Sequence, residues 1–376
     1  MPVEHPVIKV AVTEVPLQIR LTRHVRPLVQ PYKVAGSESL AVVDGQRNSQ
    51  PLGERPMSTD RYLVTGAMGC IGSWVTFHLL NDGAHVVAFD LSDDDRRHQL
   101  VLDAESRDRV EYVQGDLTDS KQVDRVTEGI THLIHLGALQ VPFCRQNRPG
   151  GALVNVVGTV NVFEAALRRS IGHLVYASSV AVFGTNDDYP VPVLGTDAER
   201  RPTTLYGVWK CANEAMARVY NLEDGLPSIG LIPHTVFGPG RDQGLTSQPT
   251  SAILAAVRNE DYHIDYGGTL GFQYAPDVAR TFIEAVRTSP EDAELFGLGG
   301  DIVTVEDFIQ AITNATGATG ITCGEAPLPF PHGMVGTPLH ERLGTTIHTP
   351  LETAVAETAA WFRRALAEDR PLPPSA

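Results

Sequence analysis

The sequence has few cysteines and no closely spaced pair of them. The four thiols belong to Cys70, Cys144, Cys211 and Cys323, so no C-x-x-C motif is present. Scattered single cysteines argue against a disulfide framework, and they are typical of reduced thiols in a cytoplasmic protein.

Long hydrophobic runs are also missing. No stretch approaches the roughly 18 consecutive apolar residues that a membrane-spanning helix needs. The first six residues, Met1 to Pro6, have neither the basic start nor the apolar core of a secretory signal. We therefore expect a cytoplasmic protein with no membrane partner.

Positive charge is in deficit as well. The 376 residues include 30 Lys and Arg against 45 Asp and Glu, a net charge of −15, and no basic run occurs. This argues against a nucleic-acid partner, although a few local arginines could still hold an anionic small molecule. His132 and His135 lie on an expected strand without an acidic partner at metal-binding spacing, so we expect them to be buried and predict no metal site.

The first part of the chain differs from the rest. Residues 1–56 hold seven prolines and a local charge of +2, and they are expected to form an N-terminal extension of unknown function. A small β element, a disordered arm and a misassigned start codon remain open for them. We expect a core over 57–233 that 275–290 rejoin, and a smaller lobe made of 234–274 and 291–376.

From residue 61 the chain alternates between strand-like and helix-like segments. Apolar runs predict strands at 61–65, 85–90, 110–114, 132–136, 173–178 and 228–233. Helical periodicity predicts helices at 71–81, 94–105, 119–127, 150–170 and 205–223, and less regularly near 250–258, 277–288, 304–315 and 350–368. Alternating βαβ units imply an α/β fold, here a Rossmann-like doubly wound parallel sheet with a smaller C-terminal substrate lobe.

A glycine loop joins the first strand to the first helix. Its sequence is Thr65-Gly66-Ala67-Met68-Gly69-Cys70-Ile71-Gly72. Strand, glycine turn and helix together place a dinucleotide pyrophosphate at a helix N-terminus. We expect the first glycine to permit the tight turn, the second to leave room for the phosphates and the third to allow close helix packing. The residues predicted to bind the cofactor here are Gly66, Gly69, Cys70, Ile71 and Gly72.

A carboxylate about 20 residues later fits the same ligand. Asp90 ends the second strand, where a carboxylate accepts both ribose hydroxyls of NAD and repels the 2′-phosphate of NADP. Arg96 and Arg97 are nearby and favour NADP instead. After the third strand, Asp116 is placed to accept from the adenine amino group, with Leu117 beside it. NAD is the predicted cofactor.

Three side chains form a catalytic set. Tyr206 and Lys210 are four residues apart, on one face of an expected helix, and Ser179 follows the strand over 173–178. A free tyrosine has a pKa near 10, and lowering it to about 7 requires roughly 4 kcal/mol from the lysine and a positive nicotinamide ring. Tyr206 can then exchange the substrate hydroxyl proton during hydride transfer, while Ser179 orients the substrate oxygen.

At this point the chain resembles a known family, the extended short-chain dehydrogenases/reductases of the NAD-dependent epimerase/dehydratase kind. The resemblance rests on Thr65–Gly72, Gly115–Leu117, His135–Ala138, Asn155–Thr159, Tyr176–Gly184, the Tyr206/Lys210 pair and Val236–Pro239. It implies a Rossmann core with a small C-terminal substrate lobe. It also implies that Gly137 and Ala138, together with Tyr206 and Lys210, contact the cofactor. Homodimers through the helices near 150–170 and 205–223 are implied too.

The departures from the family pattern concern the substrate. Ile232 and Thr235 stand where the nucleotide-sugar enzymes usually carry Arg and Asn, and Gln273 stands in a region where they usually carry Arg. Arg241 is the best remaining anion contact. A buried diphosphate without charged donors is costly to bind. We therefore expect a small sugar, polyol or sugar acid, with Ser179, Thr235 and Arg241 as substrate contacts.

These expectations combine into one function. The sequence predicts an NAD-dependent oxidoreductase or epimerase that transfers hydride at a secondary alcohol of a carbohydrate-like substrate. A nucleotide-sugar epimerase or dehydratase is the first alternative. A non-catalytic NAD-sensing regulator is an alternative of another class, although a pure binder would not require Ser179, Tyr206 and Lys210 together.

Overall fold

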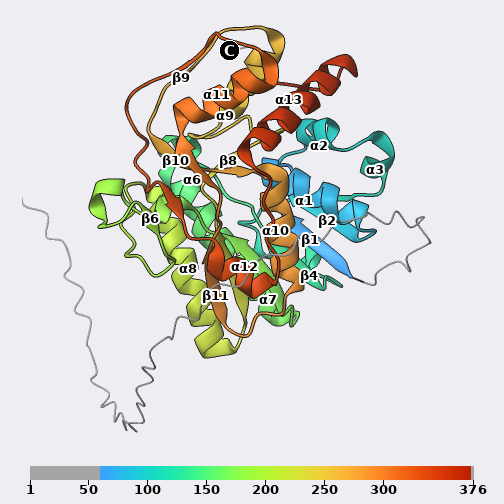
Figure 1. Ribbon diagram of the computed structural model, residues 1–376. Helices are drawn as coiled ribbons and strands as arrows, with labels where there is room; N and C mark the ends of the chain where they lie inside the picture. Colours follow the sequence, from blue (N-terminus) through green and yellow to red (C-terminus); the bar gives the residue numbers. More distant parts are fainter. Residues whose placement is uncertain (1–59, 374–376) are drawn as a thin grey trace, which may run out of the picture. The chain divides into compact units, whose positions relative to one another are not determined.

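The computed structural model describes residues 60–373, and the extension predicted over 1–56 lies outside the described residues. The core is a seven-stranded parallel sheet of order β11-β7-β5-β4-β1-β2-β3 (Figure 1). Its strands are β1 (Arg61–Thr65), β2 (His85–Asp90), β3 (Glu111–Gln114), β4 (His132–His135), β5 (His173–Ala177), β7 (Ser228–Ile232) and β11 (Ala293–Gly297). The winding direction changes between β1 and β4, and ligands of open α/β sheets bind at that point, outside the carboxyl ends of the strands.

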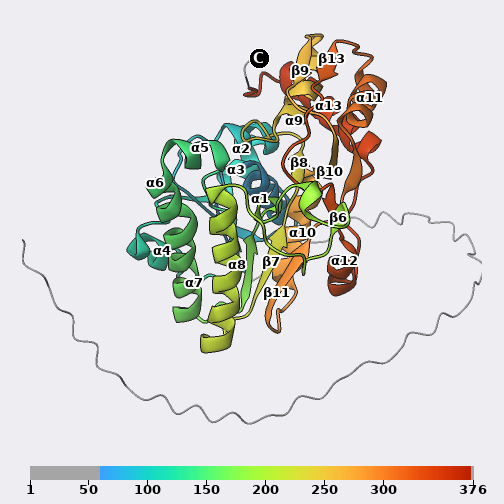
Figure 2. The same ribbon diagram turned by 90° about the vertical axis from the view of Figure 1, so that its left-hand side faces the viewer.

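Alternate residues of the central strands face two separate hydrophobic layers. Val64 packs in a layer with α1 (Cys70–Asn81) and α10 (Ala275–Arg287). Leu63 packs in the other layer, with α4 (Ser120–Val126), α7 (Gly158–Arg168) and α8 (Leu205–Asp224). Figure 2 shows these last three helices together on one side of the sheet. Because the strands are buried on both faces, their sequences are nearly continuous apolar runs, and the predicted fold class is confirmed.

The helix predicted over 94–105 is broken in the middle. The structure has α2 (Arg96–Val101) and α3 (Ala104–Asp108) instead. Leu102 between them is extended, and the Asp103 carboxylate caps α3 by accepting from the backbone N–H of Ser106 at 2.7 Å. A local cap of this kind competes with continuing the helix, which the periodicity alone did not reveal.

The helix predicted over 150–170 is also divided. It consists of α6 (Arg148–Ala152), a π-helical turn (Leu153–Val157) and α7. In the turn, the Asn155 amide donates to the carbonyl of Leu139 at 2.9 Å and accepts from its N–H at 2.7 Å. Among the described residues, 148–168 is the one helical stretch that is long and apolar enough to cross a membrane by length and composition. Because α7 packs against α4 and α8, it is a core helix of this domain.

A smaller lobe completes the described chain. Its three-stranded sheet, of order β12-β10-β8, comprises β8 (Thr235–Phe237), β10 (Thr269–Tyr274) and β12 (Asp301–Thr304). The core of the lobe includes Phe272 stacked on Phe308, with ring centroids 4.5 Å apart. The remaining elements are α5 (Val141–Gln146), α9 (Gln248–Arg258), α11 (Val305–Thr316), α12 (Thr337–Leu343), α13 (Leu351–Ala367), and the pairs β9 (Tyr262–Ile264) with β13 (Ile321–Cys323) and β6 (Val193–Leu194) with β14 (Gly333–Met334).

One predicted domain boundary is wrong. Residues 293–297, expected in the lobe segment 291–376, form β11 and extend the main sheet beside β7. This edge strand is only half-buried and carries Glu294, so it lacks the apolar run that marks the central strands. The second lobe segment therefore starts after β11. The expected return of the chain to the core is made by α10, which packs against α1.

Candidate active site

The glycine loop lies at the carboxyl ends of β1 and β4. Gly66 has a φ of +70°, and a Cβ there would stand 2.7 Å from the backbone nitrogen of Gly137 in the loop after β4. A Cβ on Gly72 would collide with the carbonyl of Gly66. Both positions therefore need glycine for a close approach of backbone to backbone.

The start of α1 fits a pyrophosphate. Gly69 is the N-cap residue, and no side chain of the described residues caps the helix. The first N–H groups of the helix, including those of Cys70 and Ile71, have no intrahelical acceptor and carry the positive end of the helix dipole. Beyond Gly69 a phosphate meets backbone donors and no Cβ, so the residues present fit the NAD pyrophosphate.

Asp90 closes this loop from the end of β2. Its Oδ2 accepts from the N–H of Met68 at 2.9 Å, and its Oδ1 accepts from the N–H of Ser92 at 3.0 Å. The carboxylate is half-buried, and each oxygen keeps lone pairs beyond these bonds. The structure thus places the predicted ribose acceptor next to the glycine loop.

The two arginines that favoured NADP are already engaged. Arg97 donates from Nε to Asp242 Oδ1 at 2.9 Å and from Nη1 to the Met68 carbonyl at 2.9 Å. Arg96 pairs with both Asp94 and Asp242, each at 3.3 Å. Because Asp242 neutralises Arg97 beside the glycine loop, the charge available to a 2′-phosphate is small.

The other predicted cofactor residues surround the same crevice. Asp116 Oδ1 accepts from the N–H of Thr118 at 2.8 Å, which leaves Oδ2 for a further donor. Leu117 is buried, and its Cδ1 approaches Gly137 so closely that a Cβ there would stand 2.6 Å away. Ala138 follows on the half-exposed part of the β4 loop.

A glycine in α8 brings the predicted catalytic set together. A Cβ on Gly207 would collide with the carbonyl of Ala181, so its absence lets α8 pack directly on the turn that follows β5. Ser179 begins this turn, and its Oγ accepts from the N–H of Ala181 at 3.2 Å. Tyr206 is next to Gly207, and its phenol lies near the hydroxyl of Ser179. Burial raises the pKa of the Tyr206 phenol, and the neighbouring Ser179 side chain and the charge of Arg241 lower it.

Lys210 lies one turn further along α8. Its Nζ donates to the carbonyl of Ala177 at 2.6 Å and lies 5.7 Å from the centroid of the Tyr206 ring. Burial lowers the pKa of Lys210 to about 8, while the carboxylate of Glu214 raises it. The ammonium is therefore largely charged at neutral pH.

The two histidines of β4 are buried, as predicted. His135 is 4% exposed, and its ring nitrogens contact the hydroxyls of Thr65 at 2.7 Å and Thr159 at 3.1 Å. Burial, with the charge of Lys210, lowers the pKa of His135 to about 3, so the imidazole is neutral. His132 stacks on the ring of Tyr62 and is also buried.

Arg241 lies on the loop after β8, and part of its guanidinium has no hydrogen-bond partner in the described chain. Its Nη2 donates to Thr246 Oγ1 at 3.1 Å, and it makes no ion pair within residues 60–373. Three buried polar atoms in this area have no hydrogen-bond partner in the described chain: Arg241 Nε, Gln140 Oε1 and Tyr266 Oη. Gln140 Oε1 and Arg241 Nη2 converge, since both crowd the position of a Cβ on Gly244.

The predicted substrate contact at Thr235 is not supported. Thr235 is 0% exposed, and its hydroxyl contacts His234 Nδ1 at 3.1 Å, so it is a core residue of β8. Ile232 is likewise 0% exposed. Gln273 accepts from the N–H of His234 at 2.8 Å and donates to the carbonyls of Leu298 and Gly299 at 2.9 and 3.0 Å. Its amide ties β10 to the end of β11 and has no capacity left for a phosphate.

Sequence reasoning missed the residues that attach the Arg241 loop to the cofactor loop. Trp74 in α1 donates from Nε1 to the carbonyl of Pro239 at 2.9 Å, and Asp242 binds Arg97. Gln140 and Tyr266 were missed as well. No local motif marks these side chains, because their partners are far away in sequence.

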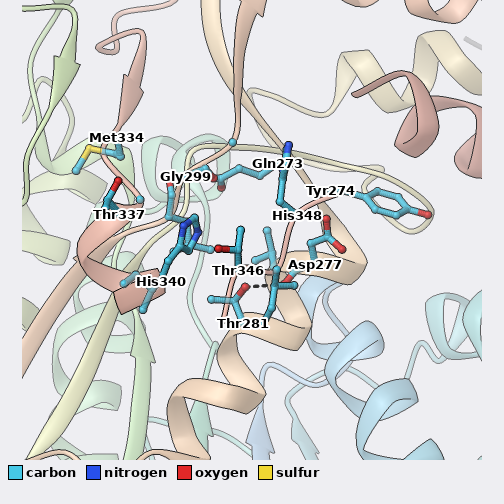
Figure 3. A pocket seen from close by; sticks show the side chains of 16 residues that line it. Gln273, Tyr274, Asp277, Thr281, Gly299, Met334, Thr337, His340, Thr346 and His348 are labelled. Carbon is cyan, nitrogen blue, oxygen red and sulfur yellow. Dashed lines mark hydrogen bonds between the residues drawn. The ribbon is translucent and has the colours of Figure 1, made fainter. Parts of the chain in front are cut away.

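A cavity of about 260 Å³ lies elsewhere in the domain (Figure 3). Its walls include Val278, Leu298 and Leu339, which belong to the core layer of α1 and α10, and the side chains of Asp277 and His340 also border it. Tyr206 and Lys210 come from α8 on the opposite face of the sheet. The cavity therefore contains none of the predicted cofactor or catalytic residues.

Comparison with known proteins agrees with this geometry. The NAD dependent epimerase/dehydratase family matches residues 62–299. The UDP-glucose 4-epimerase of Mycolicibacterium smegmatis is 32% identical over 320 residues, which cover 81% of this chain and 98% of that protein. UDP-glucuronate 4-epimerase 3 of Arabidopsis thaliana is 27% identical over 332 residues, or 80% of this chain and 76% of that protein.

Solved structures give the same result. MoeE5 in complex with UDP-glucose and NAD matches with a TM-score of 0.69 and 27% identity, over 81% of this chain and 99% of that one. The resemblance drawn from the motifs is confirmed. The chain therefore belongs to the NAD dependent epimerase/dehydratase family of enzymes, and NAD is its cofactor.

Proposed function

We propose that this enzyme removes hydride from a secondary alcohol of a small sugar, polyol or sugar acid, and that Arg241 holds the anionic end of a sugar-acid substrate. The observation that carries the proposal is the guanidinium of Arg241, which makes no ion pair within residues 60–373 and whose charge lowers the pKa of the Tyr206 phenol. Its buried Nε, with Gln140 Oε1 and Tyr266 Oη, offers both donors and an acceptor without partners in the described chain. A carboxylate next to a hydroxyl satisfies all three, because the carboxylate accepts from arginine and tyrosine while the hydroxyl donates to the glutamine.

The chain's own residues carry the proton chemistry. Ser179 orients the substrate oxygen, and Tyr206 takes the hydroxyl proton once Lys210 stabilises its phenolate. NAD, when bound, supplies the hydride acceptor and a positive charge near the phenol. If the ketone rotates in the site and hydride returns to its other face, the net result is epimerisation. If the ketone is released, the enzyme is a dehydrogenase.

A nucleotide-sugar epimerase is the second candidate, and the relatives favour it. The M. smegmatis relative is a UDP-glucose 4-epimerase, and MoeE5 is described with UDP-glucose and with UDP-glucuronic acid. Against it, Ile232 is a buried apolar residue, and the Gln273 amide is fully engaged. The positions 232, 235 and 273 therefore supply no charged donor for a diphosphate. Arg241, on the loop after β8, is the charged donor that remains there.

The two candidates are separated by ligand size. Sugars, sugar acids and nucleotide sugars are incubated with NAD, and NADH and the stereochemistry of the product are followed. We expect turnover of a sugar acid or polyol, and loss of sugar-acid affinity in Arg241→Ala. Calorimetry with UDP, GDP and dTDP in the presence of NAD is expected to give no micromolar binding.

Binding of any of these nucleotides at micromolar concentration, abolished in Arg241→Ala, would contradict the small-substrate proposal and restore the nucleotide-sugar epimerase. Turnover of a neutral polyol that is insensitive to Arg241→Ala would leave the chemistry intact and remove the anion contact. Arg342→Ala, at a partly exposed ion pair with Glu294, is the matched control for loss of an arginine.

We also propose a cytoplasmic homodimer. The π turn (Leu153–Val157) and α8 lie side by side and carry exposed apolar side chains. These are Leu153, Val157, Leu205, Val208, Val219 and Leu222. A second copy would remove this surface from water. The scattered single cysteines support a reducing compartment. Sedimentation velocity tests the dimer.

A further inference from the structure

A third polar residue shares the face of α8 that carries the catalytic pair. Tyr206, Lys210 and Glu214 follow one another at four-residue spacing, so they line one side of the helix. Only 9% of the Glu214 side chain is exposed. Its Oε1 accepts from Ser178 Oγ at 2.5 Å, and its Oε2 accepts from Arg200 Nε at 2.9 Å.

The end of β5 meets this face residue by residue. The Ala177 carbonyl accepts from Lys210, the Ser178 hydroxyl donates to Glu214, and the Ser179 hydroxyl lies near the phenol of Tyr206. Because consecutive residues of the strand end are bonded to different turns of α8, the helix cannot slide or rotate without breaking these contacts together. The distance between the Ser179 hydroxyl and the Tyr206 phenol depends on this register.

Arg200 holds Glu214 from the other side. Its Nη1 donates to the carbonyls of Thr196 and Ala198 at 2.6 and 2.7 Å, and its guanidinium lies over the Phe183 ring, 4.8 Å from the centroid. The loop over 196–200 is therefore attached to α8 through the carboxylate. Two hydrogen bonds, one from the Ser178 hydroxyl and one from the Arg200 guanidinium, therefore fix the position of the buried Glu214 carboxylate.

Glu214 also contributes the nearest negative charge to Lys210. The other titratable groups around this lysine are Tyr206 on α8, His135 on β4 and Cys144 on α5; Tyr176 on β5 faces Glu214. His135 is neutral, and burial raises the pKa of both tyrosines and of Cys144, so at neutral pH these groups carry no charge. The carboxylate of Glu214 is what opposes the desolvation of the Lys210 ammonium.

We infer that Glu214 is a positioning residue, which fixes the register of α8 against the end of β5 and keeps Lys210 charged for NAD binding and for the phenolate of Tyr206. Only the role of Lys210 in stabilising the Tyr206 phenolate rests on the proposed function. The NAD part is measured without any substrate.

The test is the affinity for NAD as a function of pH, measured by calorimetry between pH 6 and 9.5. The family resemblance implies that Lys210 contacts the cofactor, so NAD binding is expected to weaken as Lys210 loses its proton above pH 8. Glu214→Gln removes the negative charge and keeps an oxygen for Ser178. The substitution lowers the pKa of Lys210. The loss of NAD affinity at high pH, called the alkaline limb below, therefore begins about one pH unit lower than in the wild type. Turnover at neutral pH is expected to fall roughly 10- to 100-fold, because the catalytic geometry loosens.

Three variants make the result specific. Glu294→Gln removes a partly buried carboxylate of another ion pair, Arg342–Glu294, and is expected to leave the pH profile unchanged. Lys210→Met is expected to abolish the alkaline limb. Glu214→Asp keeps the charge but shortens the reach, so the limb stays in place while turnover falls.

An alkaline limb at the same pH in Glu214→Gln and the wild type would overturn the inference. So would a wild-type profile without a limb, or a limb that survives in Lys210→Met. If the proposed function is wrong, the NAD titrations still follow the expected pH dependence. The error appears instead as normal turnover of the Tyr206→Phe variant.

Discussion

The cofactor half and the substrate half of this enzyme are specified in different ways. On the cofactor side, the glycine loop and Asp90 lie within two consecutive βα units and bond to each other, as in the contact from Met68 to Asp90. In the lobe, β8 pairs with β10, which pairs with β12, and β6 pairs with β14 across 140 residues of sequence. The first half uses backbone shape and therefore requires glycines at fixed spacing. The second uses side chains that the fold brings together from distant segments.

The junction between the halves is a side-chain contact. Arg97 beside the glycine loop holds Asp242 and the Gly240 carbonyl, while Trp74 holds the Pro239 carbonyl. Arg241 sits between these anchors. The loop that carries the proposed anion contact is therefore positioned by the cofactor half.

The largest expected effect separates chemistry from cofactor binding. Tyr206→Phe removes the proton carrier with little change in volume, so turnover is expected to fall a hundredfold or more, within the range of about 10²–10⁴ for general acid–base catalysis. NAD affinity, measured by calorimetry, is expected to change little. Near-normal turnover of the variant would show that Tyr206 does not carry the proton.

A smaller effect tests the cofactor half by itself. Because Asp90 is the predicted acceptor for the adenosine ribose and Asp242 neutralises Arg97, NAD is expected to bind at least tenfold more tightly than NADP, or about 1.4 kcal/mol. Parallel titrations of the wild-type protein with NAD and NADP measure the ratio. Equal affinity, or tighter binding of NADP, would mean that Arg96 or Arg97 reaches the 2′-phosphate.

The smallest effect tests the junction. Asp242→Asn leaves Arg97 uncompensated beside the ribose site, so the preference for NAD is expected to shrink by roughly two- to fivefold, the scale of a partly exposed ion pair. The same titrations give the ratio, with Glu294→Gln as a remote control. An unchanged ratio would show that the Met68 and Gly240 carbonyls alone hold Arg97 away from the ribose.

Prediction from sequence worked where the signal is local. The strand over 85–90 and its terminal Asp90 are found as predicted, and Tyr206 and Lys210 share a helix face because four residues make about one turn. It failed where a local cap or a distant partner decided the outcome. Asp103 ended a helix that the periodicity continued, and β11 was missed because an edge strand needs no apolar run. Thr235 was taken as a substrate contact, although pairing with β10 buries it.

The sequence by itself determined the fold class, NAD as the cofactor and the placement of Tyr206 and Lys210 on one face of a helix, because each depends on spacing within one strand, turn or helix. Only the tertiary structure decided the environment of these groups. Ser178 and Glu214 are 36 residues apart, and Arg97 and Asp242 are 145 apart. Such pairs form because the packed sheet and helices bring their segments together and exclude water from them, and no spacing along the chain records that.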